Sequence, residues 1–205
     1  MRDRRLSPRY LETMLRRLVA AVILIASAVF VVRAFHLFTF RPEVLGKYVP
    51  VRWFLFGHIA GGMAALVTGP FQLWRASRSR YRRAHRVAGR VYVVGVVLAA
   101  SGALVLASTA APGVSWAYAI SLHVLATVWL GSTLLAWRTA VKRQIVKHEA
   151  WATRSYIATV AFVAQALSFE LPLVARLGTF AEVAGTVIWL SWTVPMFAYD
   201  VRREA

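Results

Sequence analysis

The chain of 205 residues contains no cysteine, and its eight acidic residues are far outnumbered by 25 lysines and arginines. Without cysteine it cannot form disulfides, thiolate metal sites, iron–sulfur clusters or covalently attached haem. Charged residues make up only 16% of the chain, whereas a soluble domain carries about a quarter. A Ser-His-Asp order, an HExxH motif and a glycine-rich phosphate loop are all missing, so a hydrolytic enzyme is the least supported class.

Long apolar runs dominate what is present. The chain is 59% hydrophobic, its mean hydropathy is +0.58, and its charges are clumped. Runs of about 18 to 25 apolar residues separate the clumps, which is the length needed to cross a bilayer as a helix. We therefore predict an all-α integral membrane protein, one domain over 1–205, with six transmembrane helices at about 15–38, 53–74, 87–110, 116–138, 151–173 and 181–199.

The basic residues predict the orientation. A net charge of +17 would indicate nucleic acid in a soluble protein, but here topology explains it. With the N-terminus in the cytoplasm, 20 of the 25 lysines and arginines lie on the cytoplasmic side, as the positive-inside rule requires. Both termini are then cytoplasmic, the first span is a retained helix, and membrane lipid rather than nucleic acid is the expected partner. High alanine and arginine content favours a bacterial inner membrane.

Spans two and three resemble spans four and five. Eleven residues separate Trp74 from His85, and eleven separate Trp137 from His148. Two hairpins of the same orientation predict a parallel repeat about an axis along the membrane normal, within a core four-helix bundle at about 53–173. Each hairpin has an outer histidine, a Trp-Arg pair, an inner histidine and an Arg-x-Tyr element, namely His58, Trp74, Arg75, His85, Arg90 and Tyr92, then His123, Trp137, Arg138, His148, Arg154 and Tyr156.

The repeated histidines are the candidate functional residues, because ionisable groups within a membrane default to a functional hypothesis. The repeat axis places His58 opposite His123 near the outer face and His85 opposite His148 near the inner face. Two neutral imidazoles on facing helices can supply both axial ligands of a b-type haem, whereas structural zinc normally takes four ligands. The four histidines are therefore candidate metal ligands for two haem b groups. The fifth, His36, has no repeat partner and is interpreted as interfacial.

The other repeated residues allow two interpretations each. Arg90 and Arg154 could pair with haem propionates, or they could set topology and contact anionic lipid. Tyr92 and Tyr156 could hydrogen-bond within the site or lie at the interface. The small residues on the histidine faces leave room for a porphyrin edge or allow close helix packing; they are Gly62, Ala65, Gly69 and Gly89.

The segments "GHIAGGMAALVTGPFQLW", "HRVAGRVYV" and "HEAWATRSY" resemble a bacterial family of predicted membrane proteins without an assigned function, over about residues 54–165. The arrangement is also similar to the cytochrome b561 class, which has six helices and one histidine on each of helices two to five. That similarity implies that His58 and His123 hold one haem and that His85 and His148 hold the other. His85 and His148 lie close to the inner boundary among charged residues, which departs from that class.

The leading hypothesis is a transmembrane di-haem b-type cytochrome, an electron-transfer oxidoreductase that passes electrons between the two membrane faces. Quinol or another small-molecule reductant is the candidate donor, and a homo-oligomer is a candidate assembly. One alternative is a metal-ion or proton-coupled transporter that uses the same histidines. Another is a non-catalytic membrane subunit whose histidines only anchor helix ends.

Overall fold

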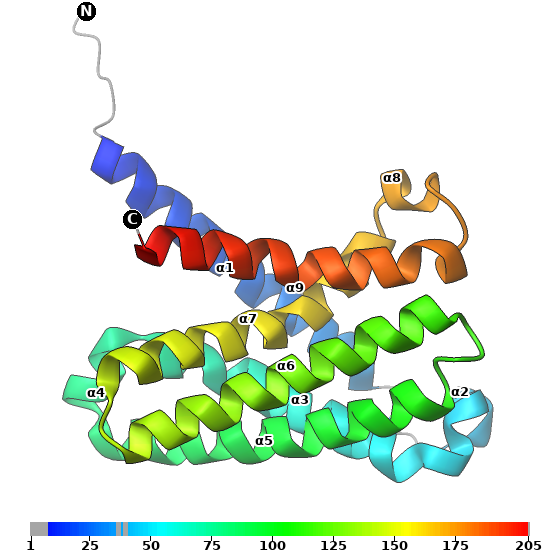
Figure 1. Cartoon of the computed structure of the whole chain (residues 1–205), viewed down its shortest axis with the longest axis horizontal. Helices are drawn as coiled ribbons and strands as arrows, with labels where there is room; N and C mark the ends of the chain where they lie inside the picture. The colour runs from blue at the N-terminus through cyan, green and yellow to red at the C-terminus, as the bar shows by residue number, and fades with distance from the viewer. Residues whose placement is uncertain (1–7, 36–37, 39–40, 205) are drawn as a thin grey trace, which may run out of the picture.

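The computed structural model describes residues 8–35, 38 and 41–204, and every regular element within them is a helix. This confirms the all-α prediction. Figure 1 shows a bundle of long helices, from which α1 leads away towards the N-terminus. Many large apolar side chains along these helices are exposed, among them Val22, Val67, Ile120 and Leu190, as expected of helices that face lipid. His36 lies outside the described residues.

The helices follow one another with short connections. Their bounds are α1 Pro8–Ala34, α2 Pro42–Leu45, the 3₁₀ helix η2 Gly46–Val51, α3 Arg52–Leu73, α4 Arg75–Arg80, α5 Arg82–Thr109, α6 Trp116–Val141, α7 Ile145–Phe169, α8 Pro172–Ala175 and α9 Phe180–Glu204.

Four of these helices form a closed bundle. α3 packs against α5, α5 against α6, α6 against α7, and α7 against α3. α9 covers α6 and α7, and α1 packs against α7 and α3 (Figure 1). Helices α3 and α6 are therefore diagonal partners, as are α5 and α7. These diagonals are the two helix pairs that the sequence predicted to share histidine sites.

Helices α3 and α5 come into backbone contact at glycines. A Cβ atom on Gly61 would collide with the carbonyl oxygen of Gly95 and would lie 2.9 Å from the amide nitrogen of Ala99. Gly57, one turn earlier, has no heavy atom within 4 Å of such a Cβ. Close helix packing through a small residue thus occurs at Gly61, where the absence of a side chain lets the backbones of α3 and α5 touch.

Within the described part of the chain, four segments are long and apolar enough to cross a membrane, namely Pro42–Leu73, Arg82–Thr109, Trp116–Val141 and Phe180–Glu204. The predicted first and fifth spans correspond to α1 and α7. In α1 the apolar segment Ala21–Arg33 is shorter than a full span, and α7 begins with the polar run from Lys147 to Glu149. The count of six spans and the cytoplasmic termini therefore stay predictions.

Helices α5 and α7 begin earlier than hydropathy predicted. α5 starts at Arg82 and α7 at Ile145, five or six residues before the predicted spans. Hydropathy falls at charged residues, but the helix continues through them because long basic side chains can reach water from a helix end. His85 and His148 consequently lie inside helices, each as the fourth residue.

The two hairpins differ at their connections. The short helix α4 joins α3 to α5, whereas a tight turn with Arg143 at a φ of 56° joins α6 to α7. We call the end of the bundle with these connections the inner end, and the opposite end, with α2, η2 and α8, the outer end. The internal repeat stays a prediction.

Candidate functional site

A cavity of about 470 Å³ lies in the outer half of the bundle. It reaches from Lys47 and Glu170 at the outer end to Trp129 and Thr159 in the bundle centre, and α1 forms part of its wall. Most of its lining is apolar. A volume of this size falls within the range of roughly 300–1,000 Å³ that is typical of small-molecule sites. We call it the outer cavity.

His58 is the histidine that lines the outer cavity. Its Nδ1 lies 2.8 Å from the carbonyl oxygen of Ala99 on α5, and since a carbonyl only accepts, Nδ1 carries the proton. The aromatic ring of Phe162 packs edge-on at a centroid distance of 5.5 Å. Among the described residues, Nε2 has no hydrogen-bond partner. The backbone carbonyl thus fixes the tautomer in which Nε2 keeps its lone pair, as is typical of ligating histidines.

Space is open next to His58. A Cβ atom on Gly62, one helical turn further along α3, would have no heavy atom within 4 Å, and Gly62 lines the outer cavity. The interpretation that a small residue leaves room for a ligand therefore holds at this position.

Polar groups occur at the wall and mouth of the outer cavity. The side-chain oxygen of Gln165 is buried without a hydrogen-bond partner. At the mouth, Arg33 forms an ion pair of 3.0 Å with Glu170 between exposed side chains, and Lys47 donates to the carbonyl of Ala110 at 3.4 Å. The cavity thus combines an apolar interior with one unsatisfied buried acceptor and cations at its entrance.

His123 does not share this cavity. Its Nδ1 donates to the carbonyl of Ala119 at 2.8 Å, and its Nε2 lies 2.9 Å from the hydroxyl of Ser108. Ser108 follows Ala99 by nine residues on α5, which places it half a turn round the helix and about 14 Å further along. His58 and His123 therefore contact opposite faces of α5, and the structure does not bring the predicted outer pair together.

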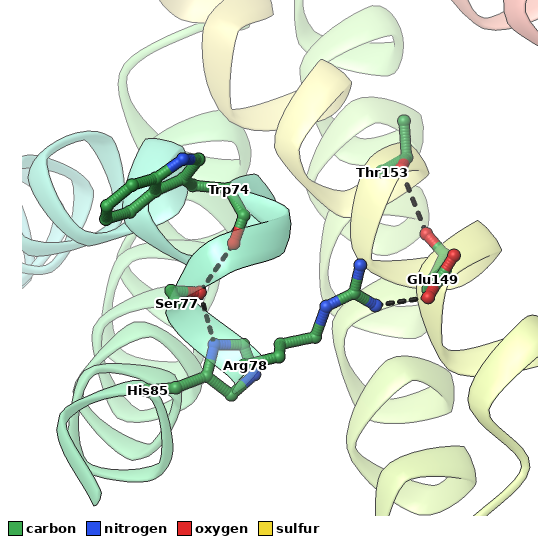
Figure 2. A network of polar contacts seen from close by, with 6 residues as sticks. All are labelled: Trp74, Ser77, Arg78, His85, Glu149 and Thr153. Carbon is green, nitrogen blue, oxygen red and sulfur yellow. Dashed lines mark hydrogen bonds and ion pairs between the residues drawn. The ribbon is translucent and has the colours of Figure 1, made fainter. Parts of the chain in front are cut away.

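The inner histidines are closer to each other. His85 and His148 lie within electrostatic range. The hydroxyl of Ser77 donates to the carbonyl of Trp74 at 2.7 Å, so His85 Nδ1, 3.0 Å from Ser77 Oγ, is the donor in that pair (Figure 2). His148 Nδ1 donates to the carbonyl of Ala136 at 2.9 Å. Both rings have Nδ1 protonated, and neither Nε2 has a hydrogen-bond partner among the described residues.

An ion pair connects α4, whose Ser77 contacts His85, with α7. Figure 2 shows Arg78 of α4 reaching the carboxylate of Glu149, the residue after His148. The hydroxyl of Thr153 donates to the backbone carbonyl of Glu149 at 2.9 Å. Because the ion pair joins α4 to α7, it holds the two inner connections against each other.

The space beside the inner pair is small. A cavity of about 60 Å³, which we call the inner cavity, is lined by His148, Gln72 and Tyr156. The ring of Tyr156 occupies the position of a Cβ on Gly69, and the Gln72 amide oxygen lies 2.9 Å from a Cβ on Gly89. Protein side chains fill the space that these two glycines were considered to leave for a porphyrin.

The repeated arginines lie away from both cavities. Arg154 forms an ion pair of 2.7 Å with Asp200 on α9, and its guanidinium lies 4.8 Å from the ring centre of Trp151. Arg90 is exposed on α5. Topology and helix docking are therefore the roles that these surroundings favour for the arginines.

The repeated tyrosines are buried inside the bundle. Tyr92 is 8% exposed, and its hydroxyl lies 2.8 Å from Ser155 Oγ and 2.9 Å from Thr159 Oγ1. The hydroxyl of Tyr156 is buried and has no hydrogen-bond partner in the part of the chain that the structure describes. Both tyrosines line the inner cavity, so the interpretation of these residues as interfacial does not hold.

Sequence reasoning missed a group of buried hydroxyls around Tyr92. Thr133 Oγ1 lies 2.6 Å from Ser155 Oγ, and Trp129 Nε1 donates to Thr159 Oγ1 at 2.9 Å. The sequence did contain a signal, because Ser155 and Thr159 are four residues apart and therefore share one face of α7.

Within the described residues, no group of three or more histidine, cysteine, aspartate or glutamate side chains could hold a metal ion.

A family model described as predicted membrane protein (DUF2306) matches residues 55–200. The chain belongs to this family. The match confirms the resemblance to a family of predicted membrane proteins, and with the apolar helices it identifies this DUF2306 protein as an integral membrane protein. No curated protein and no solved structure matches the chain. The similarity to the cytochrome b561 class and the bacterial inner membrane stay predictions.

Proposed function

We propose that this DUF2306 protein is a b-type membrane cytochrome that holds one haem in the outer cavity, with His58 as an axial ligand. The observation that carries the proposal is that His58, whose Nε2 has no hydrogen-bond partner among the described residues, lines a cavity of about 470 Å³. The protein would serve as a membrane electron-transfer oxidoreductase, with quinol or another small-molecule reductant as its candidate donor.

The residues of the outer cavity fit such a group. Its volume accommodates a large, flat apolar ligand, and Gly62 leaves open space one turn from the ligating nitrogen. At the mouth, Lys47 supplies positive charge for a carboxylate at the ligand's edge, while Arg33 is paired with Glu170. Bound there, haem iron would accept and release one electron at a time.

The protein side chains would orient and isolate the group. The Ala99 carbonyl fixes the tautomer of the His58 imidazole. The Phe162 ring packs edge-on with the imidazole and limits its rotation. Trp129, 1% exposed, closes the cavity floor in the bundle centre. A dry apolar wall of this kind controls the potential of a bound redox group.

The remaining histidines do not fit a second haem of the predicted kind. His123 does not line the outer cavity, and its Nε2 is engaged by Ser108. At the inner end a cavity of about 60 Å³ has room for a few water molecules rather than a porphyrin. The proposal therefore contains one haem per chain, in place of the two expected from the repeat.

The alternatives predict different spectra. The protein should be produced in cells supplied with a haem precursor, purified in detergent, and measured oxidised and then dithionite-reduced. The proposal predicts a Soret band and about one haem per chain by the pyridine haemochrome assay. Two haems per chain would contradict the single site. A featureless spectrum would overturn the proposal and favour a transporter or a non-catalytic subunit.

A further inference from the structure

Four hydroxyl groups form a continuous chain through the middle of the bundle. Thr133 Oγ1 lies 2.6 Å from Ser155 Oγ, which lies 2.8 Å from the Tyr92 hydroxyl, which lies 2.9 Å from Thr159 Oγ1. Thr133 and Ser155 are fully buried, and Thr159 is 1% exposed. The chain joins α5, α6 and α7 without contact with lipid or bulk water.

The two ends of this hydroxyl chain reach different cavities. Thr159 lines the outer cavity, while Thr133 lines the inner cavity. A water molecule needs only about 10–15 Å³ of cavity volume and two to four polar partners. The inner cavity of about 60 Å³ provides that room, and the buried Tyr156 hydroxyl, which has no partner among the described residues, belongs to a residue that lines it. The hydroxyl chain thus links this water-sized space to the larger outer cavity.

Both directions of hydrogen bonding satisfy every hydroxyl. In one direction Thr133 donates to Ser155, Ser155 to Tyr92, Tyr92 to Thr159, and Thr159 to the Ser155 carbonyl at 3.0 Å. In the other direction the order reverses, and Thr133 donates to the Trp129 carbonyl at 2.8 Å. A chain that can adopt two complete and opposite polarities has the property that stepwise proton transfer requires.

We propose that this hydroxyl chain conducts protons between the inner and the outer cavity. A water in the inner cavity gives a proton to Thr133 Oγ1 as the Thr133 proton moves to Ser155 Oγ. The Ser155 proton moves to Tyr92 and the Tyr92 proton moves to Thr159. The Thr159 proton turns away from the Ser155 carbonyl and leaves to a water in the outer cavity. One proton enters and one leaves, and rotation of the hydroxyls restores the first polarity.

His148 connects the inner cavity to the basic end of the protein. It lines the inner cavity and is partly exposed, and its Nδ1 is held by the Ala136 carbonyl. Nε2 is therefore the nitrogen that can exchange protons with the cavity water.

A purely structural network would contain the same bonds, since interhelical hydroxyl bonds also hold membrane helices together. The two roles differ in what they predict for proton flux. Along the hydroxyl chain, a proton that moves from the inner to the outer cavity passes through the Tyr92 and Thr159 hydroxyls. Removing either hydroxyl therefore stops conduction if the chain is a pathway, whereas a structural role predicts a change in stability alone.

The test uses the full chain in liposomes that contain a pH-sensitive dye. A potassium gradient with valinomycin sets the membrane potential, and proton entry is followed by dye fluorescence. We expect wild-type flux well above that of protein-free liposomes, with Tyr92→Phe and Thr159→Val each reducing the protein-dependent rate at least tenfold. Tyr81→Phe and Thr127→Val are the matched controls, because Tyr81 is exposed and the Thr127 hydroxyl bonds only the carbonyl of His123.

Wild-type flux equal to that of empty liposomes would overturn the proposal, as would wild-type flux in both Tyr92→Phe and Thr159→Val. Thermal unfolding and elution profiles identify a variant that fails to fold, and the other variant then decides. The proposal does not rest on haem binding. The optical spectrum tests the haem, the dye tests the proton path, and either can fail while the other stands.

Discussion

Gly61 of α3 lies directly against the backbone carbonyl of Gly95 on α5. The same helix pair places His58 Nδ1 within 2.8 Å of the Ala99 carbonyl, one turn beyond Gly95 on α5. The glycine contact therefore sets the helix distance on which the orientation of His58 depends.

Replacing Gly61 tests this contact. Gly61→Ala forces a Cβ atom into the Gly95 carbonyl, so the two helices must move apart. Overpacking of this kind costs about 1–3 kcal/mol, which should appear as a lower midpoint of thermal unfolding in detergent. Gly57→Ala is the matched control, because its Cβ meets no atom and alanine favours the helix. Equal midpoints for the two variants would show that the backbones are not in contact.

Filling the outer cavity should remove its ligand without harming the fold. Gly62 lines the outer cavity, and a Cβ atom there meets no heavy atom within 4 Å, so Gly62→Leu places a side chain in open space. Leucine is also a better helix former than glycine. We expect haem content to fall by more than half while the unfolding midpoint is unchanged or higher.

Gly131→Leu provides the control for this change. A Cβ there also meets no atom within 4 Å, and Gly131 lines neither cavity. Full haem content in Gly62→Leu would show that haem binds outside the outer cavity. An equal loss of haem in both variants would show that the loss does not depend on filling this cavity.

The ion pair between Arg154 and Asp200 should stabilise the packing of α9 on α7. The atoms are 2.7 Å apart, and the Arg154 side chain is 20% exposed. Asp200→Asn should lower stability on the order of 1 kcal/mol, near the upper range for ion pairs that water reaches. Limited proteolysis at the C-terminus should be faster in this variant.

The exposed pair between Arg33 and Glu170 offers the comparison. Both side chains are more than 60% exposed, so Glu170→Gln should change stability by only a few tenths of a kcal/mol. A larger loss of stability in Glu170→Gln than in Asp200→Asn would contradict the expectation that the less exposed ion pair stabilises the protein more.

Hydropathy predicted the long helices well, because an apolar run of bilayer length can satisfy its backbone hydrogen bonds in few structures other than a helix. It placed the starts of α5 and α7 too late because charged residues such as Arg82 end an apolar run without ending the helix. It could not predict the Arg78–Glu149 pair, because the contact between α4 and α7 depends on the tertiary arrangement of two separate connections.

The inner and the outer histidines differ in how well their sequence spacing matches between the two hairpins. Eleven residues separate each Trp from the following inner histidine, and His85 and His148 occupy equivalent helix positions. For the outer histidines the spacing differs, since sixteen residues separate His58 from Trp74 but only fourteen separate His123 from Trp137. A difference of two residues rotates a side chain by about 200° round a helix. That rotation explains why His123 faces away from the outer cavity.

The most direct test of the proposed haem site compares His58→Ala with His123→Ala in the purified protein. His58 lines the outer cavity, and its Nε2 has no hydrogen-bond partner among the described residues, whereas Nε2 of His123 lies 2.9 Å from Ser108 Oγ and His123 is not part of the cavity lining. We predict that His58→Ala loses the haem spectrum and that His123→Ala keeps it. Loss of the spectrum in His123→Ala, with its retention in His58→Ala, would contradict the account.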